Sequence, residues 1–320
     1  MRWSIYACVI VLAGVATANA EEVTLRQTAL TMDEHGFVGT LFEPADAESP
    51  VAVIVLGGSQ GATPTYRAQA VAEAGYRALA LAYFGEPGLP THLDVVPLEP
   101  ALRAIGWMHD ELLNGNGRVV LIGGSKGAEL ALLLASIEST VRGVVAVAPS
   151  HVVFQGIPEN FWPARSSWMH DDEPVPFVPY RYGPHFNPFA EEPDFHALYR
   201  ESLTQEPLVE QAAIAVESIN GPALLFSGGQ DRMWPATDMA NRIIERLEAH
   251  DHPHRHKHHV YEDAGHIIHE HAGEWATRFG GSAEANRDAG RDAWRRILDL
   301  LATLEHASSP HNGDHHEPGD

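Results

Sequence analysis

Two Gly-x-Ser-x-Gly pentads in this chain could each present a reactive serine. They are Gly57-Gly-Ser59-Gln-Gly61 and Gly123-Gly-Ser125-Lys-Gly127. A serine in such a pentad attacks carbonyl carbon when it lies on a sharp turn between a strand and a helix, where small neighbours leave room for the turn. The expected chemistry is acyl transfer through a covalent acyl-enzyme.

The flanks of the pentads favour Ser125 as the nucleophile. The apolar run 118–122 before it is typical of a strand, and 128–136 after it is a helical sequence without Pro or Gly. After Ser59 the chain reads Ala62-Thr-Pro-Thr65, which delays any helix. We therefore predict that Ser125 is the nucleophile.

A serine nucleophile needs a base, and the base needs an orienting acid. Asp231 follows a predicted strand in Leu224-Leu-Phe-Ser-Gly-Gly-Gln-Asp231, and His266 follows the last predicted strand. The order Ser, Asp, His along the chain is that of α/β-hydrolases. We predict that His266 accepts the Ser125 proton and that Asp231 fixes the imidazole tautomer.

Other assignments remain open at this point. Asp231 could instead cap the helix that begins after Pro235. Asp263 is an alternative acid, and His269 and His271 are alternative bases, in a chain that contains 20 histidines.

The oxyanion of the tetrahedral intermediate needs two backbone N–H donors. We expect one from Lys126, which follows the nucleophile at a helix N-terminus. We expect the other from Ser59 or Gln60, in the loop after the first parallel strand. The alternative is that 57–61 is an ordinary Gly-rich turn.

The hydrophobic pattern predicts an α/β fold with a doubly wound, mostly parallel sheet, because strands and helices alternate along the chain. The expected strands are 23–30, 36–43, 51–56, 76–83, 118–122, 143–148, 223–226 and 258–261, with a turn at 32–35. The expected helices are 66–74, 98–112, 128–136, 237–250 and 285–305.

Residues from about 150 to 220 interrupt this alternation and are rich in Pro and aromatic residues. We interpret them as a cap insertion over the C-terminal edge of the sheet, where α/β folds bind ligands. An apolar lid of this kind would suit an acyl or aromatic substrate, although the segment could also be a structural loop.

The ends of the chain are expected to lie outside the fold. Arg2, the apolar run 5–15 and Ala18-Asn-Ala20 predict a signal peptide at 1–20, and so an exported, periplasmic or secreted protein without stable membrane insertion. The only cysteine is Cys8, so the chain after Ala20 has no disulfide and no thiolate site. Residues 21–306 would form the catalytic domain, and 307–320 a disordered His-rich tail.

The charge and the histidines bear on possible partners. The chain has 43 Asp and Glu against 21 Lys and Arg, which argues against nucleic acid as a partner. Six histidines crowd residues 250–259, and His311, His315 and His316 lie in the tail. They could bind Zn or Cu, but we favour a solvated surface because no ligand geometry is legible, and we predict no metal and no cofactor.

Several segments jointly resemble the C-terminal catalytic domain of the acyl-CoA thioesterase / bile acid-CoA:amino acid N-acyltransferase family. The resembling segments span about 52–268 and are Tyr66-Arg67, Ala80-Leu-Ala-Tyr-Phe-Gly85, Ser125-Lys-Gly-Ala-Glu-Leu-Ala-Leu132, Arg165-Ser-Ser-Trp168, Gly229-Gln-Asp-Arg-Met-Trp-Pro235 and Ala264-Gly-His266. The resemblance implies an α/β-hydrolase fold and a Ser125–Asp231–His266 triad that cleaves acyl thioesters through an acyl-enzyme. We also expect Phe84, Trp168 and Trp234 to contact the substrate.

The chain also departs from that family. Only about 30 residues after the predicted signal peptide precede Ala52, too few for the family's N-terminal β-sandwich domain, and Ser125 stands where the amino-acid-transferring branch has cysteine. The arginines at 165, 181 and 200 are scattered rather than clustered for the phosphates of CoA. We therefore expect a serine hydrolase that cleaves acyl thioesters or carboxylic esters, with a small-molecule substrate. The alternatives are an exported carboxylesterase or acyltransferase without CoA specificity, or a metal-binding protein on a hydrolase scaffold.

Overall fold

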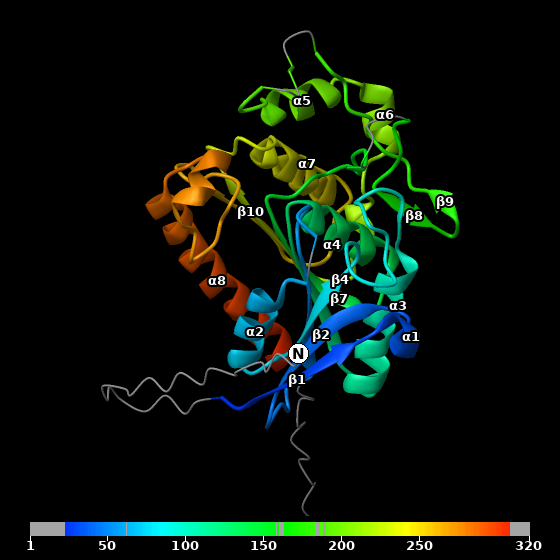
Figure 1. Cartoon of the computed structure of the whole chain (residues 1–320). Helices are drawn as coiled ribbons and strands as arrows, with labels where there is room; N and C mark the ends of the chain where they lie inside the picture. Colours follow the sequence, from blue (N-terminus) through cyan, green and yellow to red (C-terminus); the bar gives the residue numbers. More distant parts are fainter. Residues whose placement is uncertain are drawn as a thin grey trace, which may run out of the picture.

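One mostly parallel sheet of eight strands organises the molecule (Figure 1). The computed structural model describes residues 23–307 apart from 62, 158, 160–162, 184–185 and 188–189, so the predicted signal peptide and residues 308–320 of the tail lie outside the described residues. In spatial order the strands are β1 (Leu25–Leu30), β2 (Val38–Pro44), β4 (Arg77–Ala82), β3 (Val51–Leu56), β6 (Arg118–Gly124), β7 (Val141–Val147), β10 (Ala223–Gly228) and β11 (His256–Tyr261). β1 and β2 form an antiparallel edge, and all pairs from β4 to β11 are parallel.

Helices cover both faces of the sheet, which is why its central strands are apolar throughout. On β3, Val51, Val53 and Val55 pack toward one face, with α2 (Thr65–Glu73) and α8 (Ala283–His306). The alternate residues Ala52, Ile54 and Leu56 pack toward the other face. That face carries α3 (Glu99–Trp107), α4 (Lys126–Ile137) and α7 (Ala236–Ala249). Figure 1 shows these two helical layers on opposite sides of the sheet.

The doubly wound fold predicted from the sequence is confirmed, with local differences. A 3₁₀ helix that was not predicted, η3 (Glu274–Phe279), lies between β11 and α8. The expected turn at 32–35 is a single helical turn, α1 (Met32–His35), which ends because Gly36 adopts φ 74°. The expected helix 98–112 divides into α3 and the π-helical turn η1 (Met108–Leu112). The ends of the other elements differ from the prediction by a few residues.

The insertion between β7 and β10 forms a cap above the sheet (Figure 1). It contains β8 (Trp168–His170), β9 (Glu173–Pro174), α5 (Phe195–Ser202), α6 (Glu206–Gln211) and the short turn η2 (Val216–Ser218). β8 pairs with β5 (Val96–Pro97) of the body, and Phe154 and Tyr199 share an apolar cluster with Trp234, which precedes α7. Among the described residues, no helix is long and apolar enough to cross a membrane.

Candidate active site

Ser125 lies on a strained turn between β6 and α4. Its backbone has φ 55° and ψ −121°, a conformation that non-glycine residues rarely adopt, whereas Ser59 is not among the residues with positive φ. The turn is tight because a Cβ on Gly123 would overlap the carbonyl of Gly127, and one on Gly127 would overlap that of Gly57. The second pentad is thus built as a nucleophile elbow, and α2 begins only at Thr65 after the first pentad.

The side chains of Ser125, His266 and Asp231 form one hydrogen-bonded chain. His266 Nε2 lies 2.9 Å from Ser125 Oγ, and His266 Nδ1 lies 2.8 Å from Asp231 Oδ2. An ionised carboxylate only accepts hydrogen bonds, so Nδ1–H donates to Asp231 and Nε2 is left free to accept the serine proton. The structure therefore brings together the three residues singled out in the sequence, with His266 and Asp231 buried.

The surrounding loops hold the acid and the base in place. Asp231 Oδ1 accepts from the amides of Met233 (2.7 Å) and Trp234 (3.2 Å), so both carboxylate oxygens are engaged. The His266 amide donates to Phe279 O at 3.1 Å, and the Trp234 ring meets the imidazole edge to face at 5.8 Å. These contacts fix the imidazole before any substrate arrives.

The alternative acid and bases lie elsewhere. Asp231 does not cap α7, whose N-cap is Pro235. Asp263 lines a separate cavity. His269 and His271 pack against Tyr66 at ring distances of 5.3 and 5.4 Å, and His269 is a partner of the Arg67–Glu270 ion pair rather than of Ser125.

A buried ion pair beneath the elbow escaped the sequence analysis. Lys126 Nζ lies 2.5 Å from Glu129 Oε1, and both side chains are almost wholly enclosed. The same oxygen accepts from Trp168 Nε1 at 2.8 Å and from the Phe154 amide at 3.4 Å, both in the cap. Burial lowers the pKa of Lys126 and raises the pKa of Glu129, and their mutual attraction opposes both shifts.

The only trace of this pair in the sequence is the i, i+3 spacing of opposite charges inside an otherwise apolar helix. Opposite charges at this spacing usually lie on a solvated helix face, so the spacing did not predict a buried ion pair. Here it ties the first turn of α4 to the cap.

The loop after β3 approaches the nucleophile from the other side. A Cβ on Gly58 would lie 3.6 Å from Ser125 Cβ. The Tyr83 hydroxyl lies 2.7 Å from the carbonyl oxygen of Gly57 and 2.8 Å from that of Gly58, and its single proton is shared between them. Burial raises the pKa of Tyr83, which keeps the phenol protonated as a donor. The amides of the exposed Ser59 and Gln60 remain the predicted second oxyanion donor.

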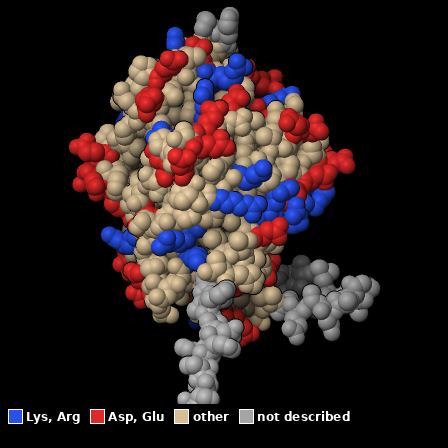
Figure 2. Space-filling view, turned by 180° about the vertical axis from the view of Figure 1, so that it is seen from behind, with Lys and Arg blue, Asp and Glu red and all other residues tan. Residues whose placement is uncertain are grey.

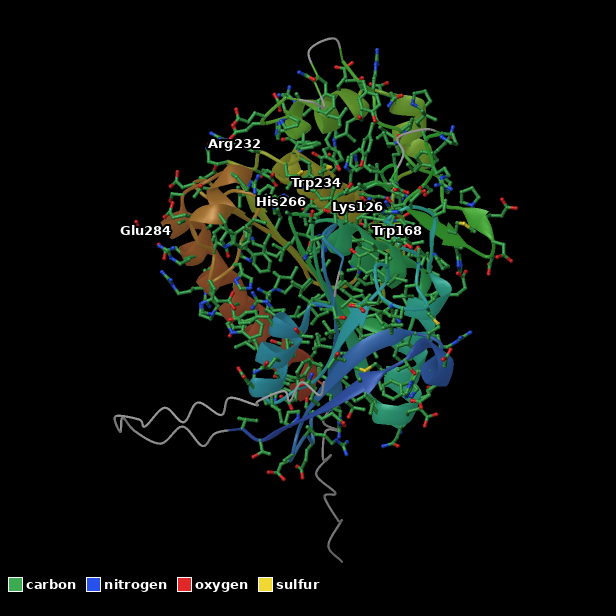
Figure 3. The ribbon with its side chains drawn as sticks, in the orientation of Figure 1. Lys126, Trp168, Arg232, Trp234, His266 and Glu284 are labelled. Carbon is green, nitrogen blue, oxygen red and sulfur yellow. The ribbon has the colours of Figure 1, made fainter. Side chains whose placement is uncertain are left out.

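The three aromatic residues expected to contact substrate are buried in the structure, and their contact with substrate stays a prediction. Trp168 and Trp234 are at most 1% exposed and Phe84 is 8% exposed. Their rings instead support other residues: Trp168 binds Glu129, Trp234 packs on His266, and Phe84 packs on Tyr83 at 5.2 Å. Figure 3 shows Lys126, Trp168, Trp234 and His266 below the cap helices α5 and α6.

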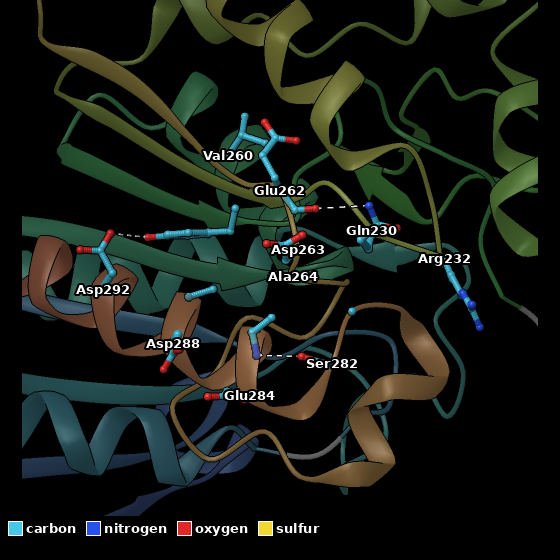
Figure 4. A pocket seen from close by; sticks show the side chains of 14 residues that line it. Gln230, Arg232, Val260, Glu262, Asp263, Ala264, Ser282, Glu284, Asp288 and Asp292 are labelled. Atoms are coloured by element: carbon cyan, nitrogen blue, oxygen red, sulfur yellow. Dashed lines mark hydrogen bonds between the residues drawn. The ribbon is translucent and has the colours of Figure 1, made fainter.

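Two cavities lie near the C-terminal edge of the sheet. One, of about 470 Å³, includes Asp231 and lies between Arg232, Phe279 and the cap residues 191–196. The other, of about 1010 Å³, lies between β11 and α8 and is rich in carboxylates, including Glu262, Asp263 and Glu284 (Figure 4). The smaller cavity borders the triad, whereas neither Ser125 nor His266 lines the larger one.

The residues that could hold a metal near the cap are Glu99, His170 and Asp171. Glu99 Oε1 already accepts from the Asp171 amide at 2.8 Å and lies 3.2 Å from His170 Nδ1. Because the Asp171 side chain is 87% exposed, this set reads as a surface joint between α3 and the cap hairpin.

Comparisons with known proteins show the family to which the chain belongs. The family model described as "BAAT / Acyl-CoA thioester hydrolase C terminal" matches residues 102–304. Acyl-coenzyme A thioesterase 1 of Rattus norvegicus is 30% identical over 292 residues, which are 85% of this chain and 65% of that protein. The mitochondrial acyl-coenzyme A thioesterase 2 of Mus musculus is 30% identical over 275 residues, with 81% and 56% covered. The chain thus spans less than two thirds of these relatives.

Solved structures share the fold at low sequence identity. An esterase of Pyrococcus furiosus has a TM-score of 0.54 at 15% identity, covering 91% of this chain and 96% of that one. An α/β-hydrolase enzyme from a Medee basin deep-sea metagenome has a TM-score of 0.52 at 16% identity, with 88% and 99% covered.

Proposed function

The chain belongs to the BAAT / acyl-CoA thioester hydrolase C-terminal family, and on that premise we propose that it is a serine hydrolase that cleaves acyl thioesters or carboxylic esters. The observation that carries the proposal is the position of the His266 imidazole, with Nε2 2.9 Å from Ser125 Oγ and Nδ1 2.8 Å from Asp231 Oδ2. This arrangement makes an alcohol nucleophilic at neutral pH.

The reaction proceeds in two halves. Ser125 Oγ attacks the acyl carbonyl while His266 Nε2 takes its proton, and the imidazolium is stabilised by Asp231. His266 then gives this proton to the departing thiolate or alkoxide, which leaves the acyl group on Ser125. Water deprotonated by His266 attacks the acyl-enzyme, and the collapse of the second intermediate returns the proton to Ser125.

The negative charge of each tetrahedral intermediate would be held by backbone amides. Lys126 is the first residue of α4, and the first amides of an α-helix have no acceptor within the helix. The loop after β3 supplies the second donor, from Ser59 or Gln60. Tyr83 supports this role because its hydroxyl holds two carbonyls of that loop.

The test is the replacement Ser125→Ala. We expect hydrolysis of p-nitrophenyl acyl esters and of acyl-CoAs of graded length to fall to background, and labelling by a fluorophosphonate probe to disappear. Ser139→Ala, at an exposed serine after α4, is the control and keeps both. Labelling that persists in Ser125→Ala, at Ser59 in particular, would overturn the assignment.

We also propose that the protein acts outside the cytoplasm, after cleavage following Ala20. The basis is Arg2, the apolar run 5–15 and the Ala18-Asn-Ala20 site. Fractionation of the expressing cells, followed by N-terminal sequencing of the exported protein, should find Glu21 as its first residue. A protein that retains Met1 in the cytoplasmic fraction would contradict this.

A further inference from the structure

Residues 279–281, at the end of η3, join the loop that carries Asp231 to the loop that carries His266. The Phe279 carbonyl accepts from the amide of His266 at 3.1 Å. It also accepts, again at 3.1 Å, from the amide of Arg232, the residue that follows Asp231. A carbonyl oxygen has two lone pairs, so it can hold both amides. Asp231 and His266 are 35 residues apart in the chain, and their loops meet at this oxygen.

Two glycines let this segment lie directly against both loops. Gly280 and Gly281 have φ angles of 102° and 66°, which favour glycine. A Cβ on Gly280 would overlap the carbonyl of Gln230, in the first loop. A Cβ on Gly265, in the second loop, would overlap the Gly280 carbonyl. The three backbones therefore touch without intervening side chains, and the segment sets the separation of the two loops.

One buried side chain, that of Asn286 on α8, holds the segment against the second loop. Its Oδ1 accepts from the Gly265 amide at 2.7 Å, and its Nδ2 donates to the Gly280 carbonyl at 3.1 Å. An amide N–H only donates and a carbonyl only accepts, so these partners fix the orientation of the Asn286 amide group. Asn286 is 0% exposed. Both bonds therefore form in a low-dielectric site, where they are strong and where losing a partner is costly.

We propose that Asn286 is a positioning residue for the imidazole of His266. Gly265, whose amide it binds, directly precedes His266 in the chain. Gly280, whose carbonyl it binds, directly follows Phe279, and the Phe279 carbonyl holds the His266 amide. Asn286 thus fixes the backbone on both sides of this contact, and through the backbone it fixes the direction of the imidazole.

This role rests on the serine-hydrolase function proposed above and extends it to a residue outside the triad. His266 Nε2 lies 2.9 Å from Ser125 Oγ and must stay within hydrogen-bond reach of it to take the proton. A displacement of about 1 Å would break this contact, and a misplacement of that size costs about a hundredfold in rate. Loss of the Asn286 amide should therefore lower kcat more than it changes KM.

The test compares Asn286→Ala with Ser282→Ala, both made in the full chain. Ser282 caps the same end of α8, since its Oγ accepts from the Ala285 amide at 3.0 Å (Figure 4). Both replacements weaken the start of α8 and should lower the Tm. Only Asn286→Ala should lower kcat for a p-nitrophenyl acyl ester, by about ten- to a hundredfold at a temperature well below both Tm values, with KM nearly unchanged.

A spectroscopic measurement separates positioning from stability. The proton between His266 Nδ1 and Asp231 should give a sharp, far-downfield ¹H resonance in the natural protein and in Ser282→Ala. In Asn286→Ala this resonance should broaden or move upfield, because the imidazole is no longer held in one direction.

Asn286→Asp is the second variant, and it carries the test if Asn286→Ala does not fold. It keeps an oxygen for the Gly265 amide and loses the N–H donor to Gly280. It should therefore retain more of kcat, and more of the downfield resonance, than Asn286→Ala does.

A folded Asn286 variant that keeps the natural kcat, or that loses kcat with the resonance unchanged, would overturn the proposal. An equal loss of kcat in Ser282→Ala would do the same. The proposed function fails on a different result, which is a natural protein whose Ser125 takes up no fluorophosphonate. The two failures are therefore distinguishable.

Discussion

At the scale of single residues, the two oxygens of Asp231 have separate tasks. Oδ2 receives the His266 proton donor, and Oδ1 receives two amides of its own turn. The carboxylate is therefore held in position by the backbone and by the imidazole together. Replacing this carboxylate by the amide of asparagine would remove its charge and keep its shape.

We predict that Asp231→Asn lowers kcat for an acyl ester by as much as about 10⁴-fold while leaving the fold intact. Asparagine is nearly isosteric, but its amide can present N–H₂ to Nδ1 and so favour the wrong imidazole tautomer. Asp263→Asn, at the other acid near the histidine loop, should leave kcat unchanged. Steady-state kinetics of both variants test this prediction. A larger loss of kcat in Asp263→Asn than in Asp231→Asn would contradict the assigned triad.

A second prediction concerns the buried pair Lys126–Glu129. Glu129→Gln should lower the free energy of unfolding by about 3–5 kcal/mol, because it leaves the enclosed Lys126 ammonium without its counter-charge. Arg242 and Glu245 have the same i, i+3 spacing but are exposed, so Glu245→Gln should cost less than about 1 kcal/mol. Urea unfolding measures both, and equal losses would show that burial does not decide the strength of the pair.

The hydrogen-bonded arrangement of Ser125, His266 and Asp231 was predictable from the sequence, whereas this ion pair was not. Ser125, Asp231 and His266 each follow a recognisable strand, and the carboxyl ends of parallel strands meet at one edge of a sheet. The burial of Lys126 and Glu129 depends on the cap lying over α4, which no local pattern encodes. Trp168 and Trp234, which were expected to contact substrate, are also buried, and their burial likewise depends on long-range packing of the cap.

At the scale of elements, periodicity predicted the regular parts because β3, β4, β6, β7 and β10 are mostly buried apolar runs and α7 and α8 have an apolar stripe. The helical turn α1 has four residues and the π-helical turn η1 has five, which is too short for a hydrophobic period to identify them. The cap is irregular because it is held by side chains, such as the Phe154, Tyr199 and Trp234 rings. Long-range packing of this kind has no period to detect.

His258, on β11, should make the free energy of unfolding depend on pH in the acidic range. Burial, the first cause, and the nearby His259 lower the pKa of His258 from 6.5 to about 4. The unfolded chain therefore binds this proton at a higher pH than the folded chain does. Stability from this group is complete above pH 6.5 and is lost as the pH falls toward 4.

His258→Gln removes this titration, so the loss of unfolding free energy between pH 7.5 and pH 5 should be smaller in the variant than in the natural protein. It should not vanish, because burial also lowers the pKa of His151 and of His269 to about 4. His250→Gln, at an exposed histidine, is the control. Urea unfolding at the two pH values measures these losses. Equal losses of unfolding free energy in the His258 and His250 variants would contradict the prediction.

At the scale of the whole molecule, negative charge is in large excess. The chain carries a formal charge of −22, and Figure 2 shows acidic side chains spread around one face, with Lys and Arg in bands across it. Two of the scattered arginines are already paired: Arg165 with Asp94, and Arg181 with Glu201. Their charges are therefore partly neutralised before any anionic substrate approaches.

This excess of negative charge predicts that salt changes kcat/KM for an anionic substrate and not for a neutral one. The field of the protein repels a polyanion, and salt shortens its range from about 30 Å at 0.01 M to about 8 Å at 0.15 M. For an acyl-CoA, kcat/KM should therefore rise several-fold between these ionic strengths, while for a neutral p-nitrophenyl ester of the same acyl group it should stay nearly constant. The neutral ester controls for effects of salt on the triad itself. A fall in kcat/KM for acyl-CoA would instead reveal a local cationic site strong enough to overcome the net charge, and arginines beside the triad, such as Arg232 at the smaller cavity, would then be the first to replace.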